Sequence, residues 1–281
     1  DVAGINTDTD ASLRSDGAVT QSGVIATGAL TLTSTGGGVA DFTLNTQDNA
    51  VTSLDADNAT LNTVSFQDNT GFAVAGIDTD ASATLTSSGE ITQTGVITAP
   101  TLTLNGGGIY TLGSQNNVVT TLDVDDAALG GDMSFRDDDG FAMTGVAGGT
   151  HNVTLSTDGT VTQTGAITNT GTLTLLSNTG GGAFTLTQAN NVTTLDGDTD
   201  TLGAVSFSDD GGGFDVTGLD SGAAITLSSS GTITQSVAGI NATTLTLAGV
   251  GTYTLGTQNN DVATLDVSGG LGGDLSFRDD N

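Results

Sequence analysis

The chain has 281 residues, of which 32 are Asp or Glu and three are Lys or Arg, so its formal net charge is −29. Nucleic acids and anionic membranes are bound through basic patches, so we expect this segment to bind no nucleic acid and to show no membrane insertion. Cations are the expected partners. Because the chain has no Cys, its stability must come from packing and hydrogen-bonded strands rather than from disulfides.

The polar residues favour strands and turns over helices. Every acidic residue except Glu90 is Asp, and Lys is absent. Helix surfaces prefer Lys, Glu, Arg and Gln, whereas Thr and Val suit strands and Gly, Asp and Asn suit turns. Stretches that alternate apolar residues with Thr or Ser predict short strands. In the second repeat these strands are FAVAG (72–76), ATLTSS (83–88), EITQTG (90–95), VITA (96–99), TLTLN (101–105), IYTLG (109–113), VVTTLDV (118–124) and DMSFRD (132–137).

An internal repeat of about 70 residues organises the chain, and it accommodates all nine Phe and both Tyr residues. One recurring series is Phe66, Phe135, Phe207 and Phe277, and another is Gln21, Gln93, Gln163 and Gln235. Alternate units resemble each other most, which gives a super-repeat of about 142 residues. The expected repeats are 1–71, 72–140, 141–213 and 214–281, and we expect the chain to be a window on a longer protein.

Two all-β architectures fit this repeat. If Phe72, Val96, Val118 and Phe141 are equivalent, steps of 24, 22 and 23 residues divide a repeat into about three turns of a parallel β-helix, or β-solenoid. Twelve such turns, stacked at about 4.8 Å, would form a rod roughly 58 Å long. The alternative is a row of tandem β-sandwich repeats with about seven antiparallel strands each. The solenoid is preferred, because a unit of about 70 residues without Cys or Trp is small for a sandwich.

In a solenoid, the recurring polar residues acquire structural roles. The Gln of the ITQ motif and the Asn residues of QNN, such as Asn117 and Asn260, are expected to form hydrogen bonds with the backbone at turns. Side-chain ladders between stacked turns are a further use for them. Neither role requires a ligand.

Three runs of the sequence resemble a known group of proteins. GEITQTGVITAPTLTLNGGGIYTL (89–112), GTVTQTGAITNTGTLTL (159–175) and GGDMSFRDDDGFAMTGV (130–146) are similar to the repeats of filamentous-haemagglutinin-like exoproteins, which are large bacterial surface adhesins. The resemblance extends over nearly the whole chain through its four repeats. It implies a right-handed parallel β-helix stalk, an extracellular or cell-surface location in bacteria, and a role in adhesion or matrix.

Clusters of Asp are the candidates for chemistry. Carboxylate oxygens at this density suit Ca²⁺, which is the one cofactor we consider. The candidate Ca²⁺ ligands are Asp55, Asp57, Asp123, Asp125, Asp137, Asp138, Asp196, Asp198, Asp279 and Asp280. The preferred interpretation is that these residues accept hydrogen bonds from the backbone at turns and keep the surface soluble, with specific Ca²⁺ sites as the alternative. The Asp pairs recur in phase, whereas a catalytic site is a single departure from a pattern, so we expect no enzyme and no catalytic residues.

The sequence therefore predicts a structural repeat segment of a giant extracellular stalk, filament or adhesin, which spans distance and mediates attachment to a cell surface or matrix. The alternative is a tandem-sandwich adhesin module that is made rigid by Ca²⁺ and binds glycans or a partner cell. Expected partners are flanking repeats of the same protein, cations, and other copies of the chain in head-to-tail self-association, because an open solenoid end exposes unpaired strand edges.

Overall fold

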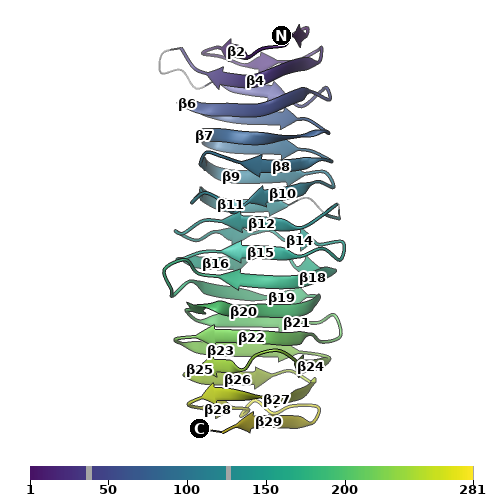
Figure 1. Cartoon of the computed structure of the whole chain (residues 1–281), viewed down its shortest axis with the longest axis vertical. Helices are drawn as coiled ribbons and strands as arrows, with labels where there is room; N and C mark the ends of the chain where they lie inside the picture. Colours follow the sequence, from purple (N-terminus) through teal and green to yellow (C-terminus); the bar gives the residue numbers. More distant parts are fainter. Residues whose placement is uncertain (36–39, 125–127, 281) are drawn as a thin grey trace. The chain divides into compact units, whose positions relative to one another are not determined.

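The structure, a computed structural model, describes residues 1–35, 40–124 and 128–280. The described residues form strands, turns and irregular segments but no helix, and the fold is a parallel β-solenoid of about 13 turns. The chain divides into two compact units, Asp1–Arg136 and Asp137–Asn281. This division lies four residues before the boundary that the sequence analysis expects between the second and third repeats. In each unit the strands of one turn lie beside those of the next (Figure 1).

The described residues of the first unit form the strands β1 (Ile5–Asn6), β2 (Ala11–Arg14), β3 (Val19–Thr20), β4 (Ile25–Thr33), β5 (Asp41–Leu44), β6 (Ala50–Gln67), β7 (Gly71–Thr86), β8 (Glu90–Gln93), β9 (Ile97–Asn105), β10 (Ile109–Leu112), β11 (Val118–Val124) and β12 (Met133–Arg136). Strands were correctly predicted in the second repeat. The predicted segment 72–76 and residues 83–86 of the segment 83–88 belong to one long strand, β7, whose pairing register shifts between them; Ser87 and Ser88 lie beyond its end.

The second unit contains the remaining strands: β13 (Ala142–Met143), β14 (Val146–Ala147), β15 (Val153–Ser156), β16 (Thr160–Gln163), β17 (Ile167–Thr168), β18 (Thr170–Leu176), β19 (Ala183–Asn190), β20 (Val192–Leu202), β21 (Val205–Asp209), β22 (Asp215–Ser221), β23 (Ala224–Ser229), β24 (Thr232–Gln235), β25 (Ile240–Ala242), β26 (Thr244–Ala248), β27 (Thr252–Val262), β28 (Leu265–Asp266) and β29 (Leu275–Asp279).

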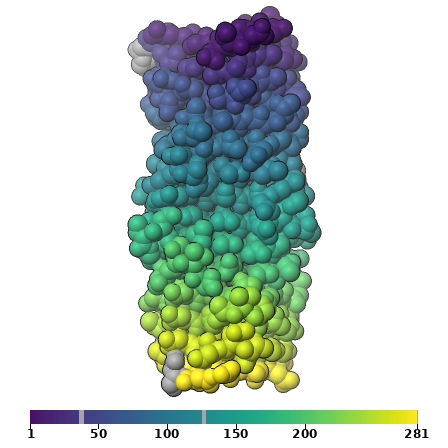
Figure 2. Space-filling view, in the orientation of Figure 1, coloured from purple at the N-terminus to yellow at the C-terminus, as the bar shows by residue number. Residues whose placement is uncertain are grey.

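Alternation within each strand places one set of side chains inside the solenoid. In β5, Phe42 and Leu44 are buried while Asp41 and Thr43 face outward. Inside, apolar residues of successive turns stack on one another. In the first unit one stack is Val19, Phe42, Val64, Ala83, Leu102 and Leu122, and the other is Phe72, Ile91, Tyr110 and Met133. These buried apolar side chains form the core of the unit. On the face seen in Figure 2 the successive turns of each unit lie in contact.

The second unit has the same arrangement. One of its stacks is Val161, Phe184, Val205, Ile225, Leu245 and Leu265; the opposite side contains Val153, Leu173, Leu195 and Val216, followed by Ile233, Tyr253 and Leu275. The strand pairings described within the two units are parallel, which excludes the antiparallel sandwich alternative.

The register refines the expected length of a turn. Phe72 pairs with Ile91 rather than stacking on Val96, and successive steps along the first stack average about 20 residues. Three steps lead from Val19 to Ala83, and the next ITQ-type strand, at Ile91, then falls in the opposite stack. One repeat therefore spans about three and a half turns rather than three.

The half turn explains why alternate repeats resemble each other. Val161 and Ile233 also occupy opposite stacks of the second unit, three steps and a half turn apart. Equivalent positions of neighbouring repeats thus meet different surroundings, whereas positions two repeats apart meet the same surroundings. Twice three and a half turns makes seven, so the super-repeat is the shortest segment that contains a whole number of turns.

Candidate functional site

Each repeat buries one glutamine and one asparagine that are hydrogen-bonded to each other. The glutamine Nε2 donates to the asparagine Oδ1 in the pairs Gln21–Asn49, Gln93–Asn117, Gln163–Asn190 and Gln235–Asn260. The four asparagines are at most 1% exposed and the glutamines at most 9%. We call each of these a Gln–Asn pair. Both residue types were expected to form backbone hydrogen bonds at turns, and their pairing with each other was not predicted from the sequence.

The asparagine of each pair ties two turns together. In the first unit, Asn117 Oδ1 also accepts the N–H of Ile97 at 2.9 Å, and its Nδ2 donates to the carbonyl oxygens of Leu112 at 3.1 Å and Arg136 at 2.9 Å. Both amide atoms are thus occupied by the backbone and by Gln93. The prediction that these Asn residues bind backbone is confirmed. The signal for the pair was the asparagine that recurs at a similar interval, 24 to 28 positions, after each ITQ-type glutamine.

The candidate Ca²⁺ ligands fall into different structural settings. Asp55 and Asp57 lie in β6, and Asp196 and Asp198 lie at the equivalent places of β20, one super-repeat later. The second residue of each pair, Asp57 or Asp198, lies over a glycine of the next turn. A Cβ atom on Gly76 would be 2.1 Å from Asp57 Oδ2, and the same contact would be 2.5 Å for Asp198. Glycine at these positions therefore leaves room for the carboxylate.

Both pairs place like charges close together. Burial raises the pKa of Asp57, and the hydrogen bond with Asp55 and the negative charges of Asp55 and Asp78 raise it further. Burial is also the main cause of the raised pKa of Asp196, with the charge of Asp198 acting in the same direction. These two carboxyl groups are therefore less stable as anions in the folded chain than in water.

Replacing Asp57 with asparagine should raise the melting temperature slightly at pH 7, by about 1 °C for this largely exposed group. A carboxyl group whose pKa is higher in the folded state destabilises the fold above that pKa, and this cost disappears as the pH falls below the unfolded value of about 3.9. The gain should therefore vanish near pH 3. Asp266→Asn is the control and should lower the melting temperature at pH 7, because the hydrogen bond from the Ser268 N–H lowers the pKa of Asp266. A lower melting temperature for Asp57→Asn at pH 7 would contradict this account.

Asp137 and Asp279 occupy a turn position that recurs in every repeat, at the end of the strand that contains the SF motif. Asp137 is 1% exposed, and its Oδ1 accepts the N–H of Asp139 at 3.0 Å. Asp279 Oδ2 accepts the N–H of Val262 at 3.1 Å. The equivalent Asp68 is fully buried and accepts the N–H of Val51 at 2.7 Å. At these positions the carboxylates cap backbone N–H groups, which is the turn role preferred for them from the sequence.

The remaining described candidates have other partners or settings. Asp138 Oδ1 accepts from the side-chain amide of Asn178 at 2.8 Å. Asp280 forms an ion pair with Arg278, which lowers its pKa. Asp123 lies in β11, paired in register with Thr103, and Asp125 lies outside the described residues. Within residues 1–35, 40–124 and 128–280, no three His, Cys, Asp or Glu side chains are grouped so that they could hold a metal ion. Binding of Ca²⁺ stays a prediction.

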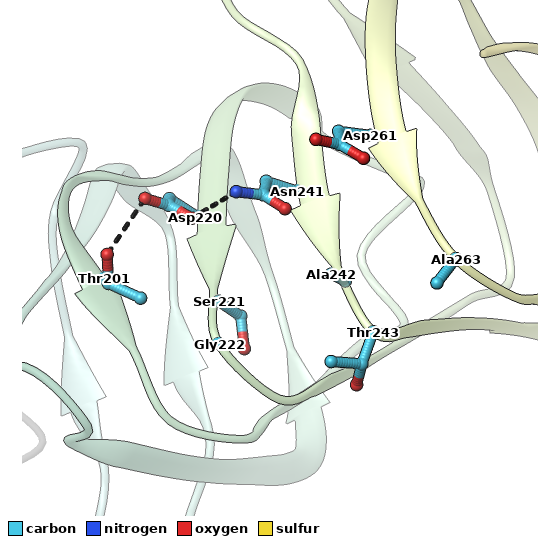
Figure 3. Close-up of a pocket in the computed structure, with 9 residues that line it drawn as sticks. All are labelled: Thr201, Asp220, Ser221, Gly222, Asn241, Ala242, Thr243, Asp261 and Ala263. Atoms are coloured by element: carbon cyan, nitrogen blue, oxygen red, sulfur yellow. Dashed lines mark hydrogen bonds between the residues drawn. The ribbon is translucent and has the colours of Figure 1, made fainter. Parts of the chain in front are cut away.

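A groove of about 330 Å³ lies on the surface of the second unit, where four successive turns contribute polar side chains (Figure 3). Asp220 of β22, Asn241 of β25 and Asp261 of β27 are partners in register and form a row across the turns. Asn241 Nδ2 donates to Asp220 Oδ1 at 2.8 Å, and Thr201 Oγ1 of β20 donates to Asp220 Oδ2 at 3.1 Å. Hydrogen bonds from both sides thus fix the Asp220 carboxylate.

The first unit has a groove at the equivalent positions, with a volume of about 240 Å³. Its lining residues Asp78, Thr98 and Val118 precede Asp220, Asn241 and Asp261 by one super-repeat. The groove is therefore a property of the super-repeat. Its oxygen-rich wall can accept hydrogen bonds from hydroxyl or ammonium groups. The groove was not predicted from the sequence, because its residues come from different turns.

Comparison with known proteins gives one match. Residues 130–199 match a family described as repeats of unknown function (DUF5649). The match covers 70 of the 281 residues, which is one repeat length. No curated protein and no solved structure matches the chain. Among the described residues there is no helix of the length and apolar character needed to cross a membrane.

Proposed function

We propose that the chain is a structural repeat segment of a giant extracellular stalk, filament or adhesin, which spans distance and connects other parts of the same protein. The observation that carries the proposal is the Gln–Asn pair, because it recurs in every repeat and its hydrogen bonds join one turn to the next. The most strongly repeated polar residues thus maintain the stacking of turns. A bacterial cell-surface or secreted location is proposed from the resemblance of the repeats to filamentous-haemagglutinin-like exoproteins.

The settings of the Asp residues support a structural role rather than a catalytic one. The buried Asp residues at the ends of the SF strands cap backbone N–H groups, and the same caps recur from repeat to repeat. The net charge of −29 favours an association with cations, including Ca²⁺, and keeps such a segment soluble. The proposed partners are flanking repeats and cations. No catalytic role is proposed for any residue.

Small-angle scattering of the 281-residue chain, with and without millimolar CaCl₂, tests this proposal. A spacer formed by one stack of about 13 turns at ~4.8 Å requires a maximum dimension near ~62 Å. The scattering curve should be the same in both conditions, because the Gln–Asn pairs need no metal to join the turns.

Two results would contradict the spacer. A particle much longer than about 62 Å would show that the units move as separate bodies. A particle that becomes more compact or more rigid only when CaCl₂ is added would instead favour a binding module whose rigidity depends on Ca²⁺. Repeating the titration with MgCl₂ and with NaCl of matched ionic strength separates specific Ca²⁺ binding from screening of the negative charges.

A further inference from the structure

The glutamine of each Gln–Asn pair has a second polar atom, the carbonyl oxygen Oε1. In Gln21, Gln93 and Gln235 this atom is buried and accepts no hydrogen bond from the described residues. The three side chains are 5, 6 and 2% exposed, respectively. Folded proteins satisfy nearly all of their buried polar atoms, either with protein groups or with ordered water. Three unsatisfied acceptors at equivalent places therefore require a common explanation.

The hydrogen bonds around the pair determine which glutamine atom is unsatisfied. In the second repeat, Asn117 Nδ2 donates to the carbonyl oxygens of Leu112 and Arg136, so the other amide atom of Asn117 is the acceptor Oδ1. This Oδ1 also accepts the N–H of Ile97. The Gln93 atom that contacts Oδ1 must therefore be the donor Nε2, which leaves Oε1 as the atom without a donor.

The third repeat satisfies the same atom with a backbone N–H. Gln163 Oε1 accepts from the N–H of Gln188 at 3.2 Å and from Asn190 Nδ2 at 3.3 Å. The loop before this asparagine is short, because Asn190 follows Leu186 by four positions. The separation is five positions in Leu44–Asn49, Leu112–Asn117 and Leu255–Asn260. Oε1 is thus satisfied in the repeat with the short loop and unsatisfied in the three repeats with the longer loop.

The added residue changes how the loop is attached to the glutamine. The short loop reads LTQAN (186–190), and the longer loops read LNTQDN (44–49), LGSQNN (112–117) and LGTQNN (255–260). In each longer loop a Thr or Ser hydroxyl donates to the backbone carbonyl oxygen of the paired glutamine, in the contacts Thr46–Gln21, Ser114–Gln93 and Thr257–Gln235. In these loops the N–H two positions before the asparagine does not reach Oε1.

We propose that one buried water molecule binds at each of the three longer loops. It donates a hydrogen bond to the glutamine Oε1 and accepts one from the backbone N–H of Gln47, Gln115 or Gln258, the residues that correspond to Gln188. The water thus takes the place of the direct hydrogen bond that the short loop makes in the third repeat. Buried water characteristically bonds to polar groups that are otherwise unsatisfied, and a bridging water is enthalpically nearly as favourable as a direct bond.

The surroundings of Oε1 favour water over a metal ion. In the third repeat a neutral N–H satisfies this atom, so the atom requires a hydrogen-bond donor and no positive charge. Ca²⁺ takes about 6–8 oxygen ligands, which usually include carboxylates. Asp48 precedes the asparagine of the first longer loop, whereas Asn116 and Asn259 stand at this position in the other two. The three loops therefore share no carboxylate there.

A crystal structure of the whole chain, at a resolution that shows ordered water, tests the assignment. The expected result is one water within about 2.7–3.2 Å of Oε1 in Gln21, Gln93 and Gln235, and none bound to Oε1 of Gln163. A second crystal soaked in RbCl identifies a monovalent cation by its anomalous scattering. An anomalous peak beside Oε1, or the absence of a bound water at any of the three sites, would overturn the proposal.

Two variants with exchanged loop lengths test the cause. Deletion of Gly113 gives the second repeat a short loop, and insertion of one glycine between Leu186 and Thr187 gives the third repeat a longer one. Magnetic relaxation dispersion of the water signal counts long-lived buried waters in solution. Relative to the unmodified chain, the count should fall by one per molecule in the deletion variant and rise by one in the insertion variant.

Gln188→Ala is the matched control, because it changes a side chain of the short loop and keeps both the loop length and the backbone N–H. Its water count should equal that of the unmodified chain. A count that does not respond to loop length would overturn the proposal. Because the two loop variants are expected to change the count in opposite directions, either one decides the question if the other does not fold.

Discussion

Replacing Asn190 with alanine is expected to lower the free energy of unfolding by about 4 kcal/mol. Asn190 is fully buried, and its Oδ1 accepts from Gln163 Nε2 at 2.5 Å and from the N–H of Ile167 at 2.8 Å. Its Nδ2 donates to the carbonyl oxygens of Leu186 and Ser208, each at 2.9 Å. Alanine would leave several buried groups without partners, at about 1–3 kcal/mol each.

The measurement is urea unfolding of the full chain, followed by circular dichroism. Gln188→Ala is the control, because Gln188 carries an exposed amide side chain on the same strand, and its loss should change stability by less than about 0.5 kcal/mol. The backbone N–H of Gln188, which donates to Gln163 Oε1, is kept in this variant. Similar midpoints for the two variants would show that the Gln–Asn pair does not stabilise the solenoid.

Asn190→Asp adds a dependence on pH to the same test. Aspartate keeps the acceptor oxygen but places a negative charge against the carbonyl oxygens of Leu186 and Ser208, in a buried site. Its pKa in the folded chain should therefore lie above the unfolded value of about 3.9. The loss in free energy of unfolding, relative to the unmodified chain, should be largest above the folded pKa of the new carboxyl group. It should shrink as the pH falls towards about 3.9. A deficit that is constant from pH 7 to pH 3 would contradict this assignment.

Replacing Gly95 with alanine is expected to cost about 3 kcal/mol. A Cβ atom at this position would lie 1.7 Å from the carbonyl oxygen of Ala75, on the preceding turn. This clash could be relieved only if the backbones of the two turns moved apart. The neighbouring strand pairing of Ile77 with Ile97 holds them in place. Overpacking against a fixed backbone falls at the upper end of the usual range of about 1–3 kcal/mol for such substitutions.

Thermal unfolding measures this effect, with Gly17→Ala as the control. A Cβ atom on Gly17 meets nothing within 4 Å, so that variant should be as stable as the unmodified chain or slightly more stable. An equally small change for Gly95→Ala would mean that the turns can separate locally, and the close approach would then have no structural importance.

The fourth repeat shows how the same contact is avoided naturally. Gly23 and Gly165 make the same close approach as Gly95, because an added Cβ atom would lie 1.9 and 1.7 Å, respectively, from a carbonyl oxygen. In the fourth repeat Val237 follows Gln235 at the equivalent distance, but one additional residue precedes Ile240. Val237 is 68% exposed, so the extra residue places its side chain outside the stack. A larger side chain is tolerated only where the chain is lengthened.

The sequence was sufficient to predict the strands and the solenoid, because both depend on local alternation and on the repeat. Phe42 and Leu44 alternate with exposed or half-exposed residues in β5, as a strand with one buried face requires. The half turn could not be predicted, because the stacking of Phe72 on Ile91 rather than on a residue near Val96 depends on how tightly each corner closes. That is a property of the three-dimensional path and not of any single motif.

The roles of the polar residues were only partly predictable. An Asp beside the SF motif indicates a turn, and Asp137 does cap a backbone N–H, but its nearly complete burial is a result of the turns above and below it. The Gln–Asn pair joins residues 24 to 28 positions apart, which is longer than one turn, so the partner could not be chosen without the register. For the same reason, Asp220 and Asp261 come to line one groove only in the folded chain.

The half turn per repeat also limits how such a chain can change its length during evolution. Duplication of one repeat would shift every later repeat to the opposite stack, so each new junction would bring together residues selected for different neighbours. Duplication of two repeats returns each residue to its original surroundings. The greater similarity of alternate repeats is what growth by pairs would leave behind, and length variants of this array should therefore differ by even numbers of repeats.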